Sequence, residues 1–183
     1  AINPDGKVPA LVTEGGRVLT EVAATLYYIA RKYPAAGLWP EGDLEAEAQV
    51  ISWMSFVAST MHGSRAKGPE HVATAFKVAN QRLGDRQWAI GRYSIADIHL
   101  FRVYWRFRPG MDAPLGTYPA LEAHHERMLA RPAVKKALEL GRKHGAKTAL
   151  DIDYRPNLWG VAGHGEGESR FVESAAVTAK LQS

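Results

Sequence analysis

A valine–proline pair near the start of the chain has the residue types of a peptide-binding edge. Val8-Pro9 follows the turn sequence Asn-Pro-Asp-Gly at residues 3–6 and opens a short apolar run. Proline has no N–H group, so Pro9 suits the first residue or the edge of a strand. Two interpretations follow: Pro9 simply marks a strand edge, or a cis Val8–Pro9 bond turns the backbone of Val8 towards a peptide-like ligand.

Glu21 places a carboxylate at the start of the next expected helix. Thr20 before it offers a capping hydroxyl, and an acidic side chain interacts favourably with the positive end of a helix dipole. A helix N-terminus is also a place where a ligand carboxylate can bind.

Polar side chains at Ser55, Ser59 and His62 recur along the second half of a helix expected over 44–62. On spacing alone, His62 is a polar residue at a helix C-terminus, where its cation would suit the dipole. The other histidines show no metal-ligand spacing and are expected at the surface or on helix faces, so no metal site is predicted; they are residues 71, 99, 124, 125, 144 and 164.

Asp97 is a carboxylate whose place in the sequence favours structure over catalysis. Ser94 precedes it at the spacing of a capping box, with Asp in place of the usual Glu or Gln. The helix that they open, over 95–107, is apolar almost all round and is expected at the centre of a bundle. A buried helix start has N–H groups that water does not reach, so a reciprocal cap is the favoured role of Asp97.

The remaining sequence predicts one hairpin followed by helices. Strands are expected over 10–12 and 17–19 around a Gly-Gly turn, and a first helix over 21–33. A linker rich in Pro and Gly then leads to the helix over 44–62, which Asp43 would cap and Gly63 would end. Further helices are expected over 69–83, over 95–107, over 118–130 with Thr117 as its cap, and from Pro132 onward.

Composition excludes several classes of protein. The 183 residues are 46% hydrophobic and 23% charged, which is ordinary for a globular protein of one or two domains. No window approaches the roughly 18 apolar residues of a membrane span. The net charge of +4 is spread along the chain without a basic run, which argues against nucleic acid. The absence of cysteine excludes disulfides and a cysteine nucleophile within these residues and fits a reducing compartment.

Three segments together resemble the glutathione transferase family. The run NPDGKVPALV, followed by VLTE, resembles the second half of the family's thioredoxin-like domain. GRYSIAD at 91–97 matches the folding motif of the family's helical domain, and YPALEAHHERMLARPAV at 118–134 resembles that domain's end. The resemblance implies an α+β, mostly α fold: a partial thioredoxin-like domain over 1–34, a linker over 35–43, an all-α bundle over 44–141 and a C-terminal extension over 142–183.

The resemblance also implies glutathione as the co-substrate, bound at the first hairpin. In the family the Val-Pro bond is cis, the valine backbone pairs with the cysteinyl part of glutathione, and the Glu and the next residue hold the γ-glutamyl end. The matching positions are Lys7, Val8, Pro9, Glu21 and Val22. Many members have a serine after the Glu; Val22 offers only its backbone N–H, which predicts a weaker hold on the glutathione carboxylate.

The segment Trp53–His62 resembles the first bundle helix of bacterial beta-class members. There the histidine faces the active-site cleft near the sulfur, and a polar residue at the position of Ser55 reaches the glutathione of the neighbouring subunit. The resemblance thus implies His62 as an auxiliary catalytic residue, and Ser59, Met61 and His62 as the lining of the substrate pocket.

The resemblance covers about residues 2–140 and leaves out the family's first strand, first helix and second strand. That segment normally carries the Cys, Ser or Tyr that hydrogen-bonds the glutathione sulfur, so the main thiol-activating residue is not expected in this chain. Either the sequence is an incomplete record of a longer protein, which we favour, or the chain is a short form.

The function implied is a glutathione transferase-like enzyme that conjugates the glutathione thiolate to electrophilic, apolar substrates, or exchanges it with disulfides, in detoxification. The alternative is a non-catalytic glutathione transferase-like module used for binding or assembly, which Val22 and the tail over 142–183 favour. A homodimer in the cytoplasm is expected, without nucleic acid or a membrane as partner. The second substrate and the role of the tail stay open.

Overall fold

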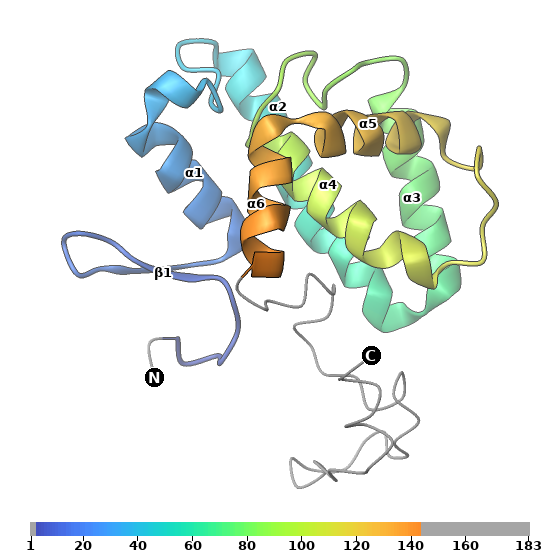
Figure 1. Ribbon diagram of the computed structural model, residues 1–183, viewed down its shortest axis with the longest axis horizontal. Helices are drawn as coiled ribbons and strands as arrows, with labels where there is room; N and C mark the ends of the chain where they lie inside the picture. The colour runs from blue at the N-terminus through green and yellow to red at the C-terminus, as the bar shows by residue number, and fades with distance from the viewer. Residues whose placement is uncertain (1–2, 144–183) are drawn as a thin grey trace, which may run out of the picture. The chain divides into compact units, whose positions relative to one another are not determined.

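A β-hairpin and a set of helices make up the part of the chain that the structure, a computed structural model, describes: residues 3–143 (Figure 1). The predicted fold class, mostly α with a small sheet, is confirmed. In chain order the elements are β1 (Ala10–Val12), β2 (Val18–Thr20), α1 (Val22–Lys32), η1 (Pro34–Ala36), α2 (Leu44–Phe56), η2 (Val57–His62), η3 (Arg65–Lys67), α3 (Pro69–Leu83), α4 (Ile95–Phe107), η4 (Arg108–Gly110), α5 (Pro119–Ala130) and α6 (Pro132–Lys143).

The hairpin forms because a glycine pair reverses the chain between two short apolar runs. β1 and β2 are antiparallel, with Ala10 opposite Thr20. In the turn, the N–H of Gly16 donates to the carbonyl of Thr13 at 2.9 Å, and Gly16 adopts a φ of 75°, which glycine takes without steric cost. The second strand lies one residue later than the predicted 17–19, so Thr20 ends a strand and does not cap the helix.

Helix α4 lies in the middle of the helices because nearly all of its surface is apolar. It contacts α1, α2, η2 and α5 (Figure 1). The carbonyl of Leu38, in the predicted linker, accepts the N–H of Ile95 at 3.1 Å and ties the linker to the start of this helix. The apolar side chains that α4 contributes to the core are Ile95, Ala96, Leu100, Val103, Tyr104 and Phe107.

The predicted capping box holds the start of α4. The hydroxyl of Ser94 accepts the N–H of Ala96, and the carboxylate of Asp97 accepts the N–H of Ser94 at 2.9 Å. Asp97 is fully buried; its other oxygen accepts the N–H of Ala89 at 2.7 Å and lies 3.0 Å from Nε2 of His124. Both carboxylate oxygens therefore have donors, which is what allows this group to be buried.

Two histidines lie in the interior, where the sequence does not predict them. Surface or helix-face positions are expected for both, but His124 is only 1% exposed and His99 only 3%. Spacing does not reveal this, because the partner of His124 is Asp97, which lies 27 residues away in the chain.

The long helix predicted over 44–62 is present, with Asp43 accepting the N–H of Ala46 at its start as expected. Its second half widens into the π-helical turns of η2, a form that often occurs near functional sites. Gly63 follows the last residue of η2 as its C-cap, as predicted, although its φ of −64° is helical and the chain does not reverse there. The chain instead turns at Gly68, whose φ of 106° disfavours any residue with a Cβ.

The start of α5 also differs from its prediction. The hydroxyl of Thr117 donates to the carbonyl of Pro114, so Thr117 does not cap this helix. The side-chain oxygen of Asn80, on α3, accepts the N–H groups of Ala120 at 2.9 Å and Leu121 at 3.3 Å. A side chain from a neighbouring helix thus caps α5, and the sequence around the start of α5 does not predict this.

Two further predictions, a loop over 160–169 and a helix over 171–181, lie outside the described residues, as does nearly all of the extension over 142–183. Between residues 3 and 143, no helix is both long and apolar enough to cross a membrane.

Candidate functional site

The open end of the hairpin brings together the five residues predicted at the first half of the site. Since Ala10 pairs with Thr20, the residues next to that pair, Pro9 and Glu21, lie at the same end of the ladder. Val8 continues the chain from Pro9, and Val22 begins α1 directly after Glu21. Two segments separated by a turn are therefore neighbours at the N-terminus of a helix.

Glu21 has the most unusual backbone of this region. Its φ of 68° lies in the left-handed region, where a residue with a Cβ costs of order 1–3 kcal/mol. No side chain caps α1, so the first N–H groups of the helix are not used by a local cap. The carboxylate of Glu21 is exposed beside them. An anionic group would be stabilised at these N–H groups, and a cationic group at the carboxylate.

The peptide of Val8 is accessible. Its side chain is 66% exposed, and the Val8–Pro9 bond is cis, which confirms that prediction. Among residues 3–143, no backbone hydrogen bond uses the Val8 peptide groups. The edge before β1 can therefore accept the main chain of an extended ligand.

Asn3 shapes the loop before Val8, a role that the turn sequence Asn-Pro-Asp-Gly only hinted at. Its side-chain amide donates to the carbonyl of Lys7 at 2.8 Å, and its side-chain oxygen accepts the N–H of Asp5 at 3.1 Å. Lys7 thus has its carbonyl fixed, while the residue itself is exposed.

The second group of predicted residues follows α2 and η2. Ser55 and Ser59 are both exposed and are linked, since the Ser59 hydroxyl donates to the Ser55 carbonyl at 2.8 Å. His62 is exposed, and its ring centre lies 5.7 Å from that of Phe107 on α4. Met61 is a correction: it is fully buried in the core, so its side chain does not line an open pocket. The π-helical winding and tertiary packing decide which way each side chain of this segment points.

His99 is buried beside this segment, and its pKa is lowered. Burial is the largest cause, followed by the charges of Arg102 and His62, and together they lower the pKa of His99 to about 4. His99 is therefore neutral at pH 7. Sequence spacing gives no sign of it, because its burial depends on how α4 packs.

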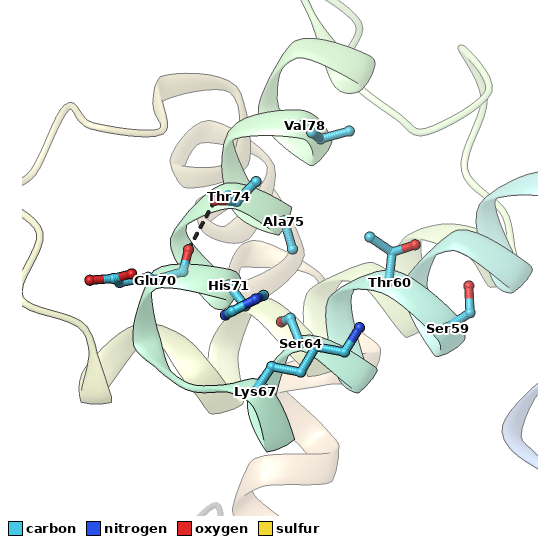
Figure 2. A pocket seen from close by; sticks show the side chains of 9 residues that line it. All are labelled: Ser59, Thr60, Ser64, Lys67, Glu70, His71, Thr74, Ala75 and Val78. Carbon is cyan, nitrogen blue, oxygen red and sulfur yellow. Dashed lines mark hydrogen bonds between the residues drawn. The ribbon is translucent and has the colours of Figure 1, made fainter.

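A groove of about 520 Å³ lies between η2 and α3 (Figure 2). Ser59 lines it, but His62 does not, so the structure does not bring these two predicted pocket residues into one hollow. One sign of this groove is visible in the sequence, because His71, Thr74 and Val78 recur at helical spacing on α3. The complete lining is Ser59, Thr60, Ser64, Lys67, Glu70, His71, Thr74, Ala75 and Val78. Within the described part of the chain, no group of His, Asp or Glu side chains could hold a metal ion.

Comparison with known proteins identifies a single family. The family of the glutathione S-transferase C-terminal domain matches residues 53–140. A curated relative, glutathione S-transferase GstA of Escherichia coli O157:H7, is 30% identical over 152 residues, which is 75% of this chain and 75% of the relative.

Solved structures agree with the sequence comparison. A glutathione transferase homologue from Sulfitobacter, with bound glutathione, superimposes with a TM-score of 0.70 at 32% identity and covers 76% of both chains. A bacterial beta-class glutathione S-transferase of Sphingomonas chungbukensis gives a TM-score of 0.67 at 33% identity, again over 76% of both chains.

Proposed function

The chain belongs to the glutathione S-transferase family, and we propose that it binds glutathione at the open end of its hairpin and presents the thiolate to an electrophile. The observation that carries the proposal is the meeting of an accessible Val8 peptide with Glu21 at an uncapped helix start. Those groups match the charges and hydrogen-bonding groups of a γ-glutamyl peptide.

Each part of glutathione has a partner in this arrangement. The Val8 peptide pairs with the cysteinyl main chain, with Lys7 and Pro9 on either side. The Glu21 carboxylate receives the α-ammonium group, and the N–H of Val22 at the start of α1 receives the α-carboxylate. The positive φ of Glu21 supports this assignment, because a left-handed non-glycine residue is a marker of functional sites.

The reaction proposed is attack of the glutathione sulfur on an electrophilic carbon, which forms a C–S bond and expels a leaving group such as chloride. Exchange with a disulfide is the second reaction of the same thiolate. Nearby N–H donors and a helix N-terminus lower a thiol pKa, which raises the thiolate fraction. We assign His62 as an auxiliary group near the sulfur and Ser59 to the substrate pocket, while Met61 is removed from that lining by its burial.

The assembly proposed is a cytoplasmic homodimer, in which Ser55, exposed on α2, contacts the glutathione of the other subunit. The domains proposed within each subunit are the thioredoxin-like part over 1–34, the linker over 35–43, the all-α part over 44–141 and the extension from 142. Light scattering during size-exclusion chromatography measures the mass, and a monomer at micromolar concentration would contradict the dimer.

One observation favours a second function, a glutathione-binding module without turnover. Val22 provides a backbone N–H but no hydroxyl where the expected carboxylate clamp has a serine, so binding is weakened. Glutathione titration by calorimetry, followed by conjugation of a chlorodinitrobenzene, separates the two. Binding with turnover supports the enzyme, and binding without turnover supports the module.

The residue-level test is Glu21→Gln, with Glu45→Gln as the matched control at the exposed start of α2. Loss of a charged hydrogen-bond partner should weaken glutathione binding about tenfold. The control should leave the affinity unchanged. Equal affinities of Glu21→Gln and the unchanged protein would contradict the assignment of Glu21.

A further inference from the structure

The groove between η2 and α3 is built from residues that the glutathione proposal does not use, apart from Ser59. None of the hairpin residues lines it. One wall carries Ser59 and Thr60, and the other carries His71 and Thr74 (Figure 2). Lys67 precedes α3 at the end where the two walls join.

The hydrogen bonds within the walls decide which polar groups remain for a ligand. The Ser59 hydroxyl donates to the Ser55 carbonyl, and the Thr74 hydroxyl donates to the Glu70 carbonyl at 2.9 Å. Among residues 3–143, no side-chain hydrogen bond or ion pair engages the Lys67 ammonium group or the Thr60 hydroxyl, although the Thr60 carbonyl accepts the N–H of Gly63. The ammonium group of Lys67 and the hydroxyl of Thr60 are therefore donors that a ligand can use.

The electrostatics of the groove favour an anion. Lys67 is a full positive charge, and it stands beside the N-terminal, positive end of the 15-residue helix α3. Glu70 is the one acidic residue of the lining, and its carboxylate points away from Lys67 and His71 (Figure 2). A negative group near Lys67 and His71 would thus meet attraction from the cation and from the helix dipole.

The floor of the groove is apolar. Ala75 is buried, and Val78, farther along α3, is 42% exposed although its side chain is hydrophobic. Both are within the lining, on the same side of α3 as Thr74 (Figure 2). The groove therefore offers a polar, positive end and an apolar floor, and its volume of about 520 Å³ suits a small organic molecule.

We propose that this groove is a binding site for a small aromatic or aliphatic carboxylate, distinct from the glutathione-binding end of the hairpin. The carboxylate lies between Lys67, Thr60 and His71, and the apolar body rests on Ala75 and Val78. The site shares Ser59 with the proposed substrate pocket, but none of the glutathione-contacting groups of the hairpin takes part in it, so loss of benzoate binding and loss of glutathione binding are separate outcomes.

The experiment uses benzoate as the probe and follows the backbone amide signals of the whole chain by NMR. Benzoate should shift the amides of Thr74 and Ala75 in a saturable way, while benzamide and benzylamine, its neutral and cationic relatives, should not. Lys67→Ala should weaken benzoate binding about threefold to tenfold. Lys77→Ala, which removes a lysine of α3 outside the groove, should leave it unchanged.

Three results would overturn the proposal. Equal shifts with benzoate and benzamide would mean that the apolar floor alone attracts the ring. Equal loss of affinity in Lys67→Ala and Lys77→Ala would mean that net charge matters and the groove does not. If benzoate does not shift the amide signals of Thr74 and Ala75, the groove binds no such ligand in solution. This conclusion holds even if the cause is a second copy of the chain that covers the groove.

Discussion

Two helix starts in this chain follow opposite designs. At the start of α4, Ser94 and Asp97 cap the helix reciprocally, and the buried carboxylate of Asp97 has a donor on each oxygen. At the start of α1, Glu21 has a φ of 68°, no side chain caps the helix, and the carboxylate is exposed.

The difference shows that the hydrogen-bonding groups at a helix terminus can either stabilise the fold or bind a ligand. Where the hydrogen-bonding groups are satisfied inside the protein, the terminus contributes to folding and has nothing left for a ligand. Where they are left open and the backbone is strained, the terminus costs stability and is available for binding. Substitutions at the two helix starts test this contrast.

The largest effect is expected at the buried start. Asp97→Ala should lower the free energy of unfolding by about 3–5 kcal/mol, because it leaves His124 and the N–H groups of Ala89 and Ser94 without their acceptor. Urea unfolding followed by circular dichroism measures it, with Asp97→Asn as the milder variant if the alanine protein does not fold.

The control for Asp97 is Asp43→Ala, at the exposed N-cap of α2. Asp43 makes one capping hydrogen bond, so its loss should cost only about 1 kcal/mol. Equal losses at Asp43 and Asp97 would remove the distinction between a buried, fully satisfied cap and an exposed one.

A second test of the buried region uses pH. The pKa of His99 is lowered to about 4 from the usual 6.5 of a histidine, so the unfolded chain binds its proton first as pH falls. The contribution of His99 to the free energy of unfolding is fully present above pH 6.5 and is lost between pH 6.5 and about 4. The loss amounts to about 3 kcal/mol.

His99→Gln should reduce the acid-induced loss of stability by that amount, measured as the difference between urea unfolding at neutral and at acidic pH. His71→Gln, at an exposed histidine on α3, should retain the full loss. If acidification lowers the free energy of unfolding of both variants as much as that of the wild-type protein, the burial of His99 has no energetic consequence.

The smallest effect is expected at the open start. Glu21→Gly should raise the free energy of unfolding by about 1 kcal/mol, because glycine accepts the positive φ without strain. Glutathione binding should weaken in the same variant. Thermal unfolding and calorimetry measure the two quantities on the same samples.

The matched change Glu45→Gly, in the first turn of α2, should act in the opposite direction and lower stability by about 1 kcal/mol. A loss of stability in Glu21→Gly would show that Glu21 is held by favourable contacts, and the contrast between the two helix starts would fail.

Local sequence was enough for much of this fold. The Gly-Gly turn and the apolar runs around it predict the hairpin, and the Ser94–Asp97 spacing predicts the capping box. The start and end of α3, after Gly68-Pro69 and at Leu83, were also predictable. These features depend on backbone preferences and on hydrogen bonds between residues a few positions apart in the sequence. They can therefore be predicted without the structure.

The candidate site was only partly predictable. The Val8-Pro9 and Glu21 segments carried the family resemblance, but neither pattern indicates the left-handed backbone of Glu21. The inward direction of Met61 and the groove lined by Lys67 were also out of reach, because they depend on the π-helical winding of η2 and on its packing against α3.

The amino-acid sequence is enough to assign the family, the order of the helices and the chemical groups available at each helix start. Which of those groups have hydrogen-bond partners and which are open depends on how the helices pack. Asp97 meets His124 across 27 residues, and Asn80 caps a helix 40 residues later. Such pairings follow from how whole helices pack, since burial forces each polar group to find whatever partner the fold brings within reach.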